Sequence, residues 1–274
     1  MKLWRELTLV KETGYCQPDN SNAESELEFF TLHARPRPAD RILLFGCSDL
    51  NVLAAFAECG PYDVTVTDLS DLRLDAAIRL AEERALDVAC VRAEQRRCLL
   101  ADQSFDAVAI FGDSLAPPND MNQPITLLAE AKRLLRPSGT LVLTFDDGDW
   151  RRKHFPPDDV EMLPDGFIYR RSQLSEDADR LITHEFVASQ ELGLATERLS
   201  VERLLGADQI LAMLNKCGFE ATSFCKRVPG RPRASMFSRE FPPRLYFSGR
   251  TGPQRKTSPR LQLVKSGRPE GAIS

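Results

Sequence analysis

The sequence predicts an α/β protein built on a doubly wound, mostly parallel sheet that carries a small antiparallel insertion. From about residue 24 to residue 146, short apolar stretches alternate with segments of helical periodicity. The apolar stretches are continuous rather than alternating, which is typical of parallel strands covered on both faces. After Phe145 this rhythm gives way to two strand-like runs joined by a polar turn, which indicates an antiparallel hairpin.

The predicted helices have recognisable ends. "SELEFFTLHA" stops at the alternating prolines of "RPRPAD", and "LNVLAAFAEC" ends at Gly60 as a C-cap. Ser70 is expected to cap the next helix, and Gly218 to follow the last one. The predicted strands are "RILLF", "DVTVT", "DVACVR", "FDAVAIF", "TLVLTF", the hairpin "GFIYRRSQL" and "RLITHEFVA", the strand after Gly218, and "RLYFSG". Repeated βα units of this length favour right-handed crossovers.

Three regions are expected along the chain. Residues 1–40 form an N-terminal helical cap on the substrate side, and residues 41–251 form the α/β domain, with its insertion at about residues 150–200. Residues 252–274 read as a basic, disordered tail, because proline, glycine and charge dominate them.

Composition narrows the class of protein. The chain has 274 residues, 42% hydrophobic and 28% charged, as in ordinary globular domains. It contains no apolar run of the ~20 residues that a membrane-spanning helix needs, and its first residues lack the apolar core of a secretory signal. We therefore expect a cytoplasmic protein without a membrane partner.

Cysteines and histidines do not form a metal-binding pattern. The seven cysteines are scattered without a C-x-x-C pair, and the three histidines lie far apart. We predict reduced, mostly buried cysteines and no metal site.

Charge is distributed unevenly. Residues 226–274 hold twelve Lys or Arg and two acids, out of 36 basic and 40 acidic residues in the chain. A solvated tail is the simpler interpretation, with contact to RNA or an acidic partner as the alternative.

Carboxylates stand at the ends of two predicted strands. Asp68 lies 22 positions after Gly46, which matches the offset at which an acid accepts hydrogen bonds from both hydroxyls of a ribose. The alternative role of Asp68 is to cap the following helix. Glu94 ends the third strand and could accept from an exocyclic adenine amine, while Ala93 leaves room for a flat ring; an ordinary exposed glutamate is the alternative.

The order of these pieces resembles the motifs of class I S-adenosylmethionine-dependent methyltransferases over about residues 24–251. The pieces that carry the resemblance are "RILLFGCSDLNVLAAFAECG", "YDVTVTDLS", "VACVRAEQ", "QSFDAVAIFGDS", "AKRLLRPSGTLVLTF" and "LAMLNKCGFEATSF". The turn and strand "LLRPSGTLVLTF" is the most specific of them. The late hairpin resembles the subgroup that has a small antiparallel insertion near its substrate.

The resemblance implies a seven-stranded sheet whose last strand, "RLYFSG", runs antiparallel. It also implies S-adenosylmethionine as the cofactor, with Asp68 on the ribose and Glu94 near adenine. The residues implied to bind the cofactor are Gly46, Cys47, Ser48, Asp68, Leu69, Glu94, Phe111 and Gly112.

The first motif departs from the family pattern. Leu44 occupies the usual acidic position, and Ser48 and Leu50 replace the second and third glycines. Leu50 could reach into the space of the cofactor's methionine portion. Asp49 could pair with the cofactor's ammonium group or cap the helix.

Three possible functions follow from these features. The first is methyl transfer to a small-molecule acceptor, which requires alignment and water exclusion more than a nucleophile. The catalytic residue is unknown; Asp113 and His154 are the candidate bases, with a structural role as the alternative for each. We do not expect nucleic acid as the substrate. The second function is that of a catalytically silent, partner-binding subunit. A cofactor kept for non-methyl chemistry is a third reading, and a homodimer or a protein partner stays open.

On the hairpin, one of His184 and Glu185 must face inward by strand alternation. Tyr169 either lines the substrate pocket or packs under the hairpin, and packing is favoured.

Overall fold

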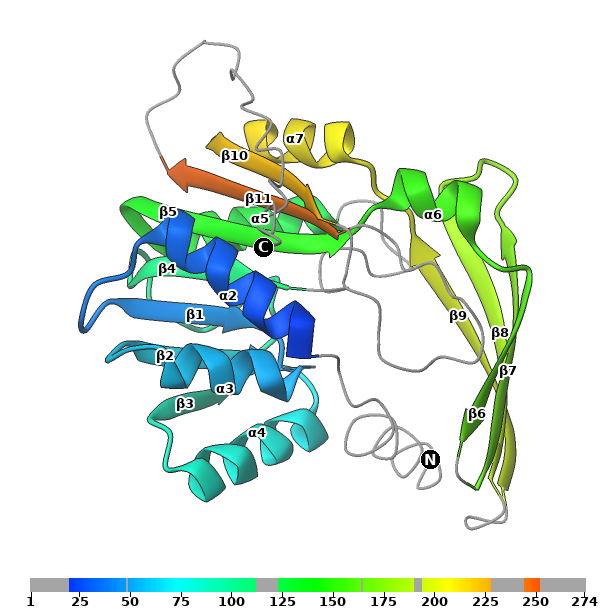
Figure 1. Cartoon of the computed structure of the whole chain (residues 1–274). Coiled ribbons are helices and arrows are strands. Elements are labelled where there is room, and N and C mark those ends of the chain that lie inside the picture. The colour runs from blue at the N-terminus through cyan, green and yellow to red at the C-terminus, as the bar shows by residue number, and fades with distance from the viewer. Residues whose placement is uncertain are drawn as a thin grey trace, which may run out of the picture.

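The computed structural model describes residues 20–47, 49–111, 123–163, 165–189, 194–227 and 244–251. A seven-stranded sheet forms the body of the protein, and a separate four-stranded sheet lies beside it (Figure 1). The order in the large sheet is β10-β11-β5-β4-β1-β2-β3. The strands in chain order are β1 (Arg41–Phe45), β2 (Asp63–Asp68), β3 (Val88–Arg92), β4 (Phe105–Ile110), β5 (Leu135–Asp146), β10 (Phe219–Arg227) and β11 (Arg244–Thr251).

The first five strands run parallel, as the continuous apolar pattern predicts. β1 pairs with β2 on one side and with β4 on the other, so the chain reverses its direction of winding at β1. Ile42, Leu43 and Leu44 are at most 3% exposed, which confirms that this strand is covered on both faces. β11 is antiparallel to both β5 and β10, as the resemblance implied.

Helices cover both faces of the large sheet. One face carries α2 (Asn20–Ala34), α3 (Leu50–Glu58) and α4 (Asp71–Arg84), through an apolar cluster that includes Phe29, Phe56 and Leu74. The other face carries α5 (Gln123–Leu134) and α7 (Ala207–Lys216), through Leu128, Leu214 and their neighbours. Within the described residues no helix is both long and apolar enough to cross a membrane.

Local signals explain where these helices begin and end. Asp49 caps α3 by accepting from the amides of Asn51 and Val52, and Ser70 caps α4 by accepting from Arg73. Gly218 follows α7 with φ +75°, as predicted. The C-cap of α3 is Cys59 in a right-handed conformation, so the prediction of a cap at Gly60 was one residue late.

The insertion is larger than the predicted hairpin. Its four strands are all antiparallel, in the order β6 (Asp158–Leu163), β7 (Gly166–Leu174), β8 (Arg180–Ser189) and β9 (Leu194–Arg203). The predicted hairpin is the central pair, β7 and β8. The outer strands were missed because charged residues mask their strand periodicity: β6 has three acids, and β9 has both acidic and basic residues.

Backbone and side-chain contacts of α6 (Gly148–His154) attach the four-stranded sheet to the body. The amide of Gly148 donates to the carbonyl of Leu205 (3.0 Å), and Arg152 donates to the carbonyls of Ala178 and Leu204. Arg151 pairs with both Asp146 and Glu202. This junction sets the position of the inserted sheet over the end of β5.

The six cysteines within the described residues are free thiols. Cys16 and the basic tail lie outside the described residues.

Only glycine fits at position 148. A Cβ there would lie 2.4 Å from the amide nitrogen of Leu205 and 2.6 Å from its carbonyl oxygen. We expect Gly148→Ala to lower the free energy of unfolding by about 1–3 kcal/mol, because overpacked backbone must shift. Thermal denaturation measures this loss.

Gly249→Ala is the control, because its Cβ would meet Phe219 at 3.3 Å, a contact that a small shift relieves. Equal melting temperatures for the two variants would contradict the tight junction.

Candidate functional site

The candidate site begins at the carboxyl end of β1. Gly46 has φ +90°, a conformation that side-chain-bearing residues rarely adopt. Its amide donates to the carbonyl of Thr67 (2.7 Å), so the chain leaving β1 turns across the end of β2. The single glycine of the first motif is therefore the one that the turn requires.

Asp68 connects three loops at this edge. Its Oδ2 accepts from the amide of Cys47 (3.1 Å), and its Oδ1 accepts from the amide of Ser70 (2.9 Å). Its backbone carbonyl accepts from the amide of Ala93 (3.1 Å), after β3. The alternative role for Asp68 as the helix cap is not what the structure shows, since Ser70 is the N-cap of α4.

The burial of Cys47 and the negative charge of Asp68 together keep the Cys47 thiol neutral. The Cys47 Sγ lies 3.6 Å from Asp68 Oδ2, and Cys47 is 3% exposed. Burial, and then the negative charge of Asp68, raises the pKa of the Cys47 thiol far above its ordinary value. Cys47 therefore has the environment of a structural thiol, not of a nucleophile.

Leu69 and Glu94 flank this carboxylate at the surface. Leu69 is 59% exposed directly after the buried Asp68, so a large apolar side chain stands open at the edge of the sheet. Glu94 is exposed and forms an ion pair with Arg96. An exposed pair of this kind contributes little, about 0–1 kcal/mol, so a ligand can displace it readily.

Arg133 fixes the loop that carries Glu94. Its guanidinium donates to the carbonyls of Cys98 (2.9 Å) and Leu100 (3.0 Å) and pairs with Glu130 and Asp102. Hydrogen bonding to Glu130 raises the pKa of Arg133. The sequence did not reveal that Arg133 holds this loop, although Arg133 lies in the predicted "AKRLL" helix just before the "RPSG" turn.

An apolar wall lies on the other side of Gly46. Phe111 follows β4 and packs on Phe56, with ring centroids 5.4 Å apart. Leu44 is buried in the same cluster, and Leu50 packs against it. Leu50 is thus engaged with the core, and Asp49 caps α3. Ser48, Gly112 and Asp113 lie outside the described residues.

A buried carboxylate that the sequence reasoning missed lies on α2. Glu26 is 1% exposed, accepts from Thr144 Oγ1 (2.9 Å) and forms an ion pair with Arg244. Burial raises the pKa of Glu26 to about 7, against the opposing effect of Arg244. The signal in the sequence was an acid placed three and four residues before Phe29 and Phe30, on the apolar side of the helix.

The more buried face of the four-stranded sheet carries a cluster of ion pairs beside buried apolar residues such as Ile168 and Leu181. Arg170 pairs there with Asp159 (3.3 Å), Glu161 (2.7 Å) and Glu185 (2.8 Å). Glu185 is 7% exposed whereas His184 is exposed, so Glu185 is the member of that pair that faces inward. β1 and β5 point their carboxyl ends toward this sheet (Figure 1).

His154 lies apart from the Asp68 cluster. It ends α6 in an exposed position, stacks on Trp150 with centroids 4.5 Å apart, and its Nδ1 is 2.9 Å from the Trp150 carbonyl oxygen. Among the described residues, no hydrogen bond or ion pair recorded for His154 reaches Gly46, Cys47 or Asp68. The structure thus brings Gly46, Cys47, Asp68 and the Glu94 loop together, and leaves His154 elsewhere.

The sequence was compared with protein-family models, and residues 42–139 match the model described as a methyltransferase domain. Those residues run from β1 into β5, and they include Gly46, Asp68, Glu94 and Phe111. Residues 42–139 are therefore similar to a methyltransferase domain. Comparison with curated protein sequences gave no match.

Solved structures show that the fold extends over most of the chain. The CcbJ methyltransferase from Streptomyces caelestis is 20% identical with a TM-score of 0.69, over 90% of this chain and 96% of that one. An S-adenosylmethionine-dependent methyltransferase from Clostridium acetobutylicum is 12% identical with a TM-score of 0.68, over 92% and 100%. A sugar N-methyltransferase from Streptoalloteichus sp. is 24% identical with a TM-score of 0.58, over 86% and 89%.

The described residues within 42–139 fit the adenosine half of S-adenosylmethionine, the ligand that the resemblance implies. Two backbone amides and the Cys47 thiol occupy three of the roughly four acceptor positions of the Asp68 carboxylate, and the remaining position is on Oδ1. Its nearest described cation, Arg73, is 3.8 Å away and half-exposed, so it can move aside. Leu69 offers an open apolar surface for a flat ring.

We expect Glu26 to make stability depend on pH. Its folded-state pKa of about 7 exceeds the ordinary 4.5, so the folded state binds the proton more tightly. Stability is then highest below pH 4.5 and falls by about 3 kcal/mol as the pH rises to 7. Denaturant unfolding at several pH values should show this fall, and Glu26→Gln should flatten it.

Glu24→Gln is the control, because Glu24 is exposed on the same helix. If the Glu26→Gln protein keeps the slope of the parent between pH 4.5 and 7, the assignment to Glu26 is wrong.

Proposed function

We propose that the chain is an S-adenosylmethionine-dependent methyltransferase that transfers a methyl group to a small-molecule acceptor. The observation that carries the proposal is the Asp68 carboxylate, held by the amides of Cys47 and Ser70 beside the glycine turn of a methyltransferase domain. In this arrangement a fixed acceptor lies where a ribose diol can donate to it.

The residues around Asp68 have distinct proposed roles. Asp68 binds the ribose hydroxyls, and Leu69 covers one face of adenine. Glu94 gives up its ion pair with Arg96 and accepts a hydrogen bond from the exocyclic amine of adenine instead. Gly46 and Cys47 let the ligand approach the backbone closely, because Gly46 has no Cβ and Cys47 points its thiol at Asp68. Ser48 and Gly112 complete the set as proposals from the motif alone.

When bound, S-adenosylmethionine supplies a methyl group that its sulfonium has already activated. The protein then needs to align the acceptor and to exclude water. Phe111 and Phe56 provide an apolar wall at the end of β4, and the inward face of the four-stranded sheet provides charged partners centred on Arg170. These charged partners favour a polar acceptor, and one structural neighbour is a sugar N-methyltransferase.

A proton acceptor is required only if the attacking atom must lose a proton during transfer. Asp113 remains a proposal for that role. The stacking and hydrogen bond of His154 support a structural role for it instead.

The N-terminal region is proposed to complete the substrate side. α2, within residues 1–40, packs on the body, and its Glu26 bridges β5 and β11 through Thr144 and Arg244. The insertion at about residues 150–200 would cover the acceptor from the opposite direction.

A silent, partner-binding subunit is the second candidate. Leu44 stands where the family has an acid, and its hydrocarbon side chain, buried in the core, has no atom that can hydrogen-bond a cofactor. The two candidates differ in one property, which is the binding of the cofactor.

Cofactor binding by the parent protein and by the Asp68→Ala variant distinguishes the methyltransferase from the silent subunit. We expect the parent protein to bind S-adenosylmethionine and S-adenosylhomocysteine, and the variant to bind each about 10–100-fold more weakly, because charge-assisted hydrogen bonds contribute about 1.5–3 kcal/mol. Isothermal titration calorimetry measures both affinities. Asp71→Ala is the control, since Asp71 is exposed and pairs with Arg92 on the surface.

Because Asp68→Ala also removes two structural hydrogen bonds, Leu69→Ser serves as a second variant at an exposed position. It should weaken binding without lowering the melting temperature. A parent protein that binds neither compound would favour the silent subunit, and an Asp68→Ala protein that binds normally would contradict the placement of the ribose.

A further inference from the structure

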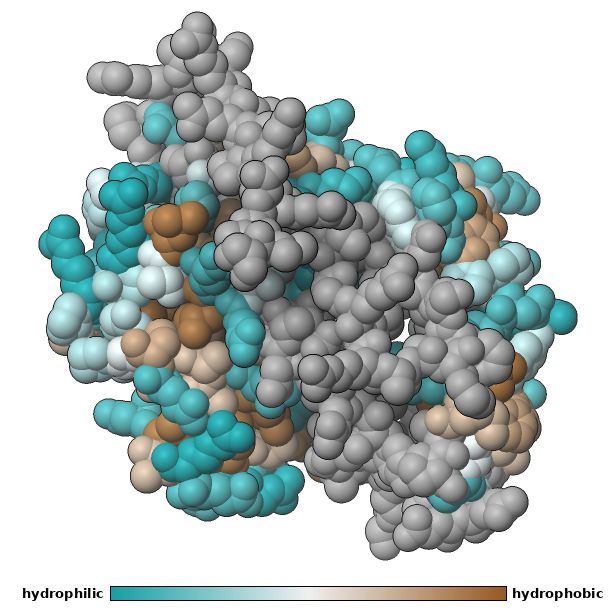
Figure 2. Space-filling view, in the orientation of Figure 1, coloured by the Kyte–Doolittle hydropathy of each residue, from teal (hydrophilic) through white to brown (hydrophobic). Residues whose placement is uncertain are grey.

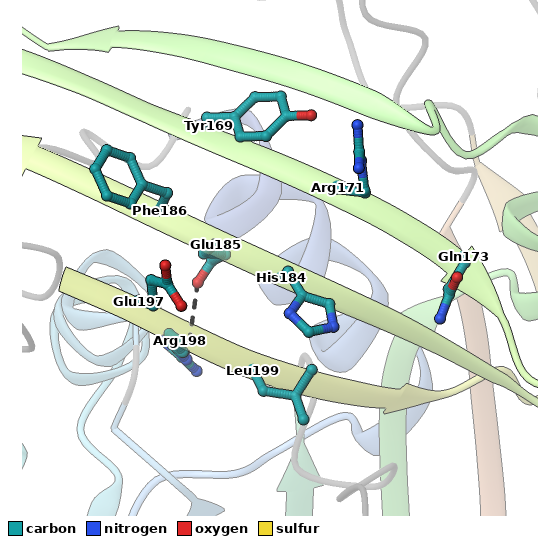
Figure 3. A pocket seen from close by; sticks show the side chains of 9 residues that line it. All are labelled: Tyr169, Arg171, Gln173, His184, Glu185, Phe186, Glu197, Arg198 and Leu199. Carbon is teal, nitrogen blue, oxygen red and sulfur yellow. Dashed lines mark ion pairs between the residues drawn. The ribbon is translucent and has the colours of Figure 1, made fainter.

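Glu26 is a buried carboxylate that has no part in the roles proposed for the site around Asp68. Burial raises its pKa to about 7, so the protonated and the charged forms are both populated near neutral pH. Glu185 is buried too, but on the four-stranded sheet it lies between Arg170 (2.8 Å) and Arg198 (3.7 Å, dashed in Figure 3). Its charge is therefore balanced within that sheet. Glu26 is the buried acid whose charge a ligand can change.

Strand register places Glu26 close to the end of β1. The last row that pairs across β5, β4 and β1 consists of Leu143, Ile110 and Phe45. Thr144, which donates to Glu26, is one residue beyond this row, and so are Phe111 and Gly46. These three residues therefore lie level at the carboxyl ends of adjacent strands. Because neighbouring strands are about 4.8 Å apart, Thr144 lies about 10 Å from Gly46 across the sheet.

The elements packed on α2 present one cation and one anion to Glu26. α2 lies against β5, β11 and α3. β5 presents the hydroxyl of Thr144 (2.9 Å), β11 presents Arg244, and α3 presents its cap, Asp49, whose negative charge also raises the pKa of Glu26. The neighbouring acids on the same helix are exposed: Glu24 and Glu28. Since Asp49 caps the helix that follows the Gly46 turn, Glu26 already responds to a charge at the edge of the candidate site.

The positive sulfonium of S-adenosylmethionine belongs on the same side of Asp68 as Glu26, and this step rests on the proposed function. In that function the ribose lies at the end of β2, and adenine lies beside Leu69 and Glu94. Adenine and the sulfonium are attached to opposite sides of the ribose, so the sulfonium extends toward the ends of β1 and β4. S-adenosylhomocysteine has the same skeleton without the sulfonium charge.

We propose that the sulfonium charge of the bound cofactor displaces the proton of Glu26, so that binding of S-adenosylmethionine releases this proton to the solvent. A cation about 10 Å away favours the carboxylate over the carboxylic acid, most strongly where water is excluded. The O–H bond of the acid breaks, a buffer molecule takes the proton, and Glu26 stays charged beside Arg244. Arg244 also keeps Asp146 (3.5 Å) as a partner. Glu26 thereby distinguishes the charged cofactor from its neutral demethylated product.

Isothermal titration calorimetry of the full chain measures this proton. Titrations at about pH 6.5 in phosphate and in imidazole, whose ionisation enthalpies differ, give the number of protons released. The parent protein should release about half a proton more with S-adenosylmethionine than with S-adenosylhomocysteine, because Glu26 is mostly protonated at that pH. Between about pH 6 and pH 8, its affinity for S-adenosylmethionine should rise about three- to tenfold relative to its affinity for S-adenosylhomocysteine.

Glu26→Gln should abolish the difference in proton release between the two ligands. Glutamine has nearly the same shape and still accepts from Thr144, but it does not titrate. Glu24→Gln is the matched control, because it makes the same change at an exposed position of α2 and should keep the difference. The two ligands are also compared on the parent protein alone, so the test does not depend on the folding of a variant.

Two results would overturn this inference alone. One is equal proton release with both ligands on the parent protein, and the other is a folded Glu26→Gln protein that retains the difference. A parent protein that binds neither compound would overturn the inference together with the proposed function.

Discussion

The structure depends on one carboxylate at the end of β2. Asp68 binds the amides of two successive loops through its side chain and that of a third through its backbone, so it fixes the relative positions of the chain after β1, β2 and β3. A buried, hydrogen-bonded acceptor of this kind is costly to disturb. The same rigidity makes it a suitable contact for a ribose, since the protein has already paid the ordering cost that binding would otherwise incur.

The position of this carboxylate follows from the topology. β1 pairs with β2 on one side and β4 on the other, and ligands of open α/β sheets bind at such a reversal, outside the carboxyl ends of the strands. Gly46 and Phe111 flank the reversal. The inserted sheet then lies beside that edge, with the Arg170 ion pairs on its inward face and exposed apolar side chains such as Met162 on its outward face (Figure 2 shows the hydropathy of one side of the molecule).

The sequence predicted those parts of the fold whose cause is local. Apolar runs such as "RILLF" indicated buried strands, and Asp49 and Ser70 could be recognised as caps from their chemistry. β6 and β9 could not be predicted, because their charged residues are satisfied by cross-strand partners such as Arg170 with Glu161, which only the folded sheet brings together. Glu26 and Arg244 were missed for the same reason, since they are 218 positions apart. Asp68 and Gly46 were accessible because their spacing reflects one βα unit.

The most direct test is a crystal structure of the chain with S-adenosylhomocysteine. We expect density at the carboxyl edge of β1 and β2, with both ribose hydroxyls within about 3 Å of the Asp68 carboxylate, the ordinary length of such a hydrogen bond. Side chains of Leu50 and Phe111 should border the ligand without displacing it. Two results would contradict the binding of a ribose by Asp68. One is an edge without ligand density whose space is filled by those two side chains, and the other is a ligand whose ribose does not contact Asp68.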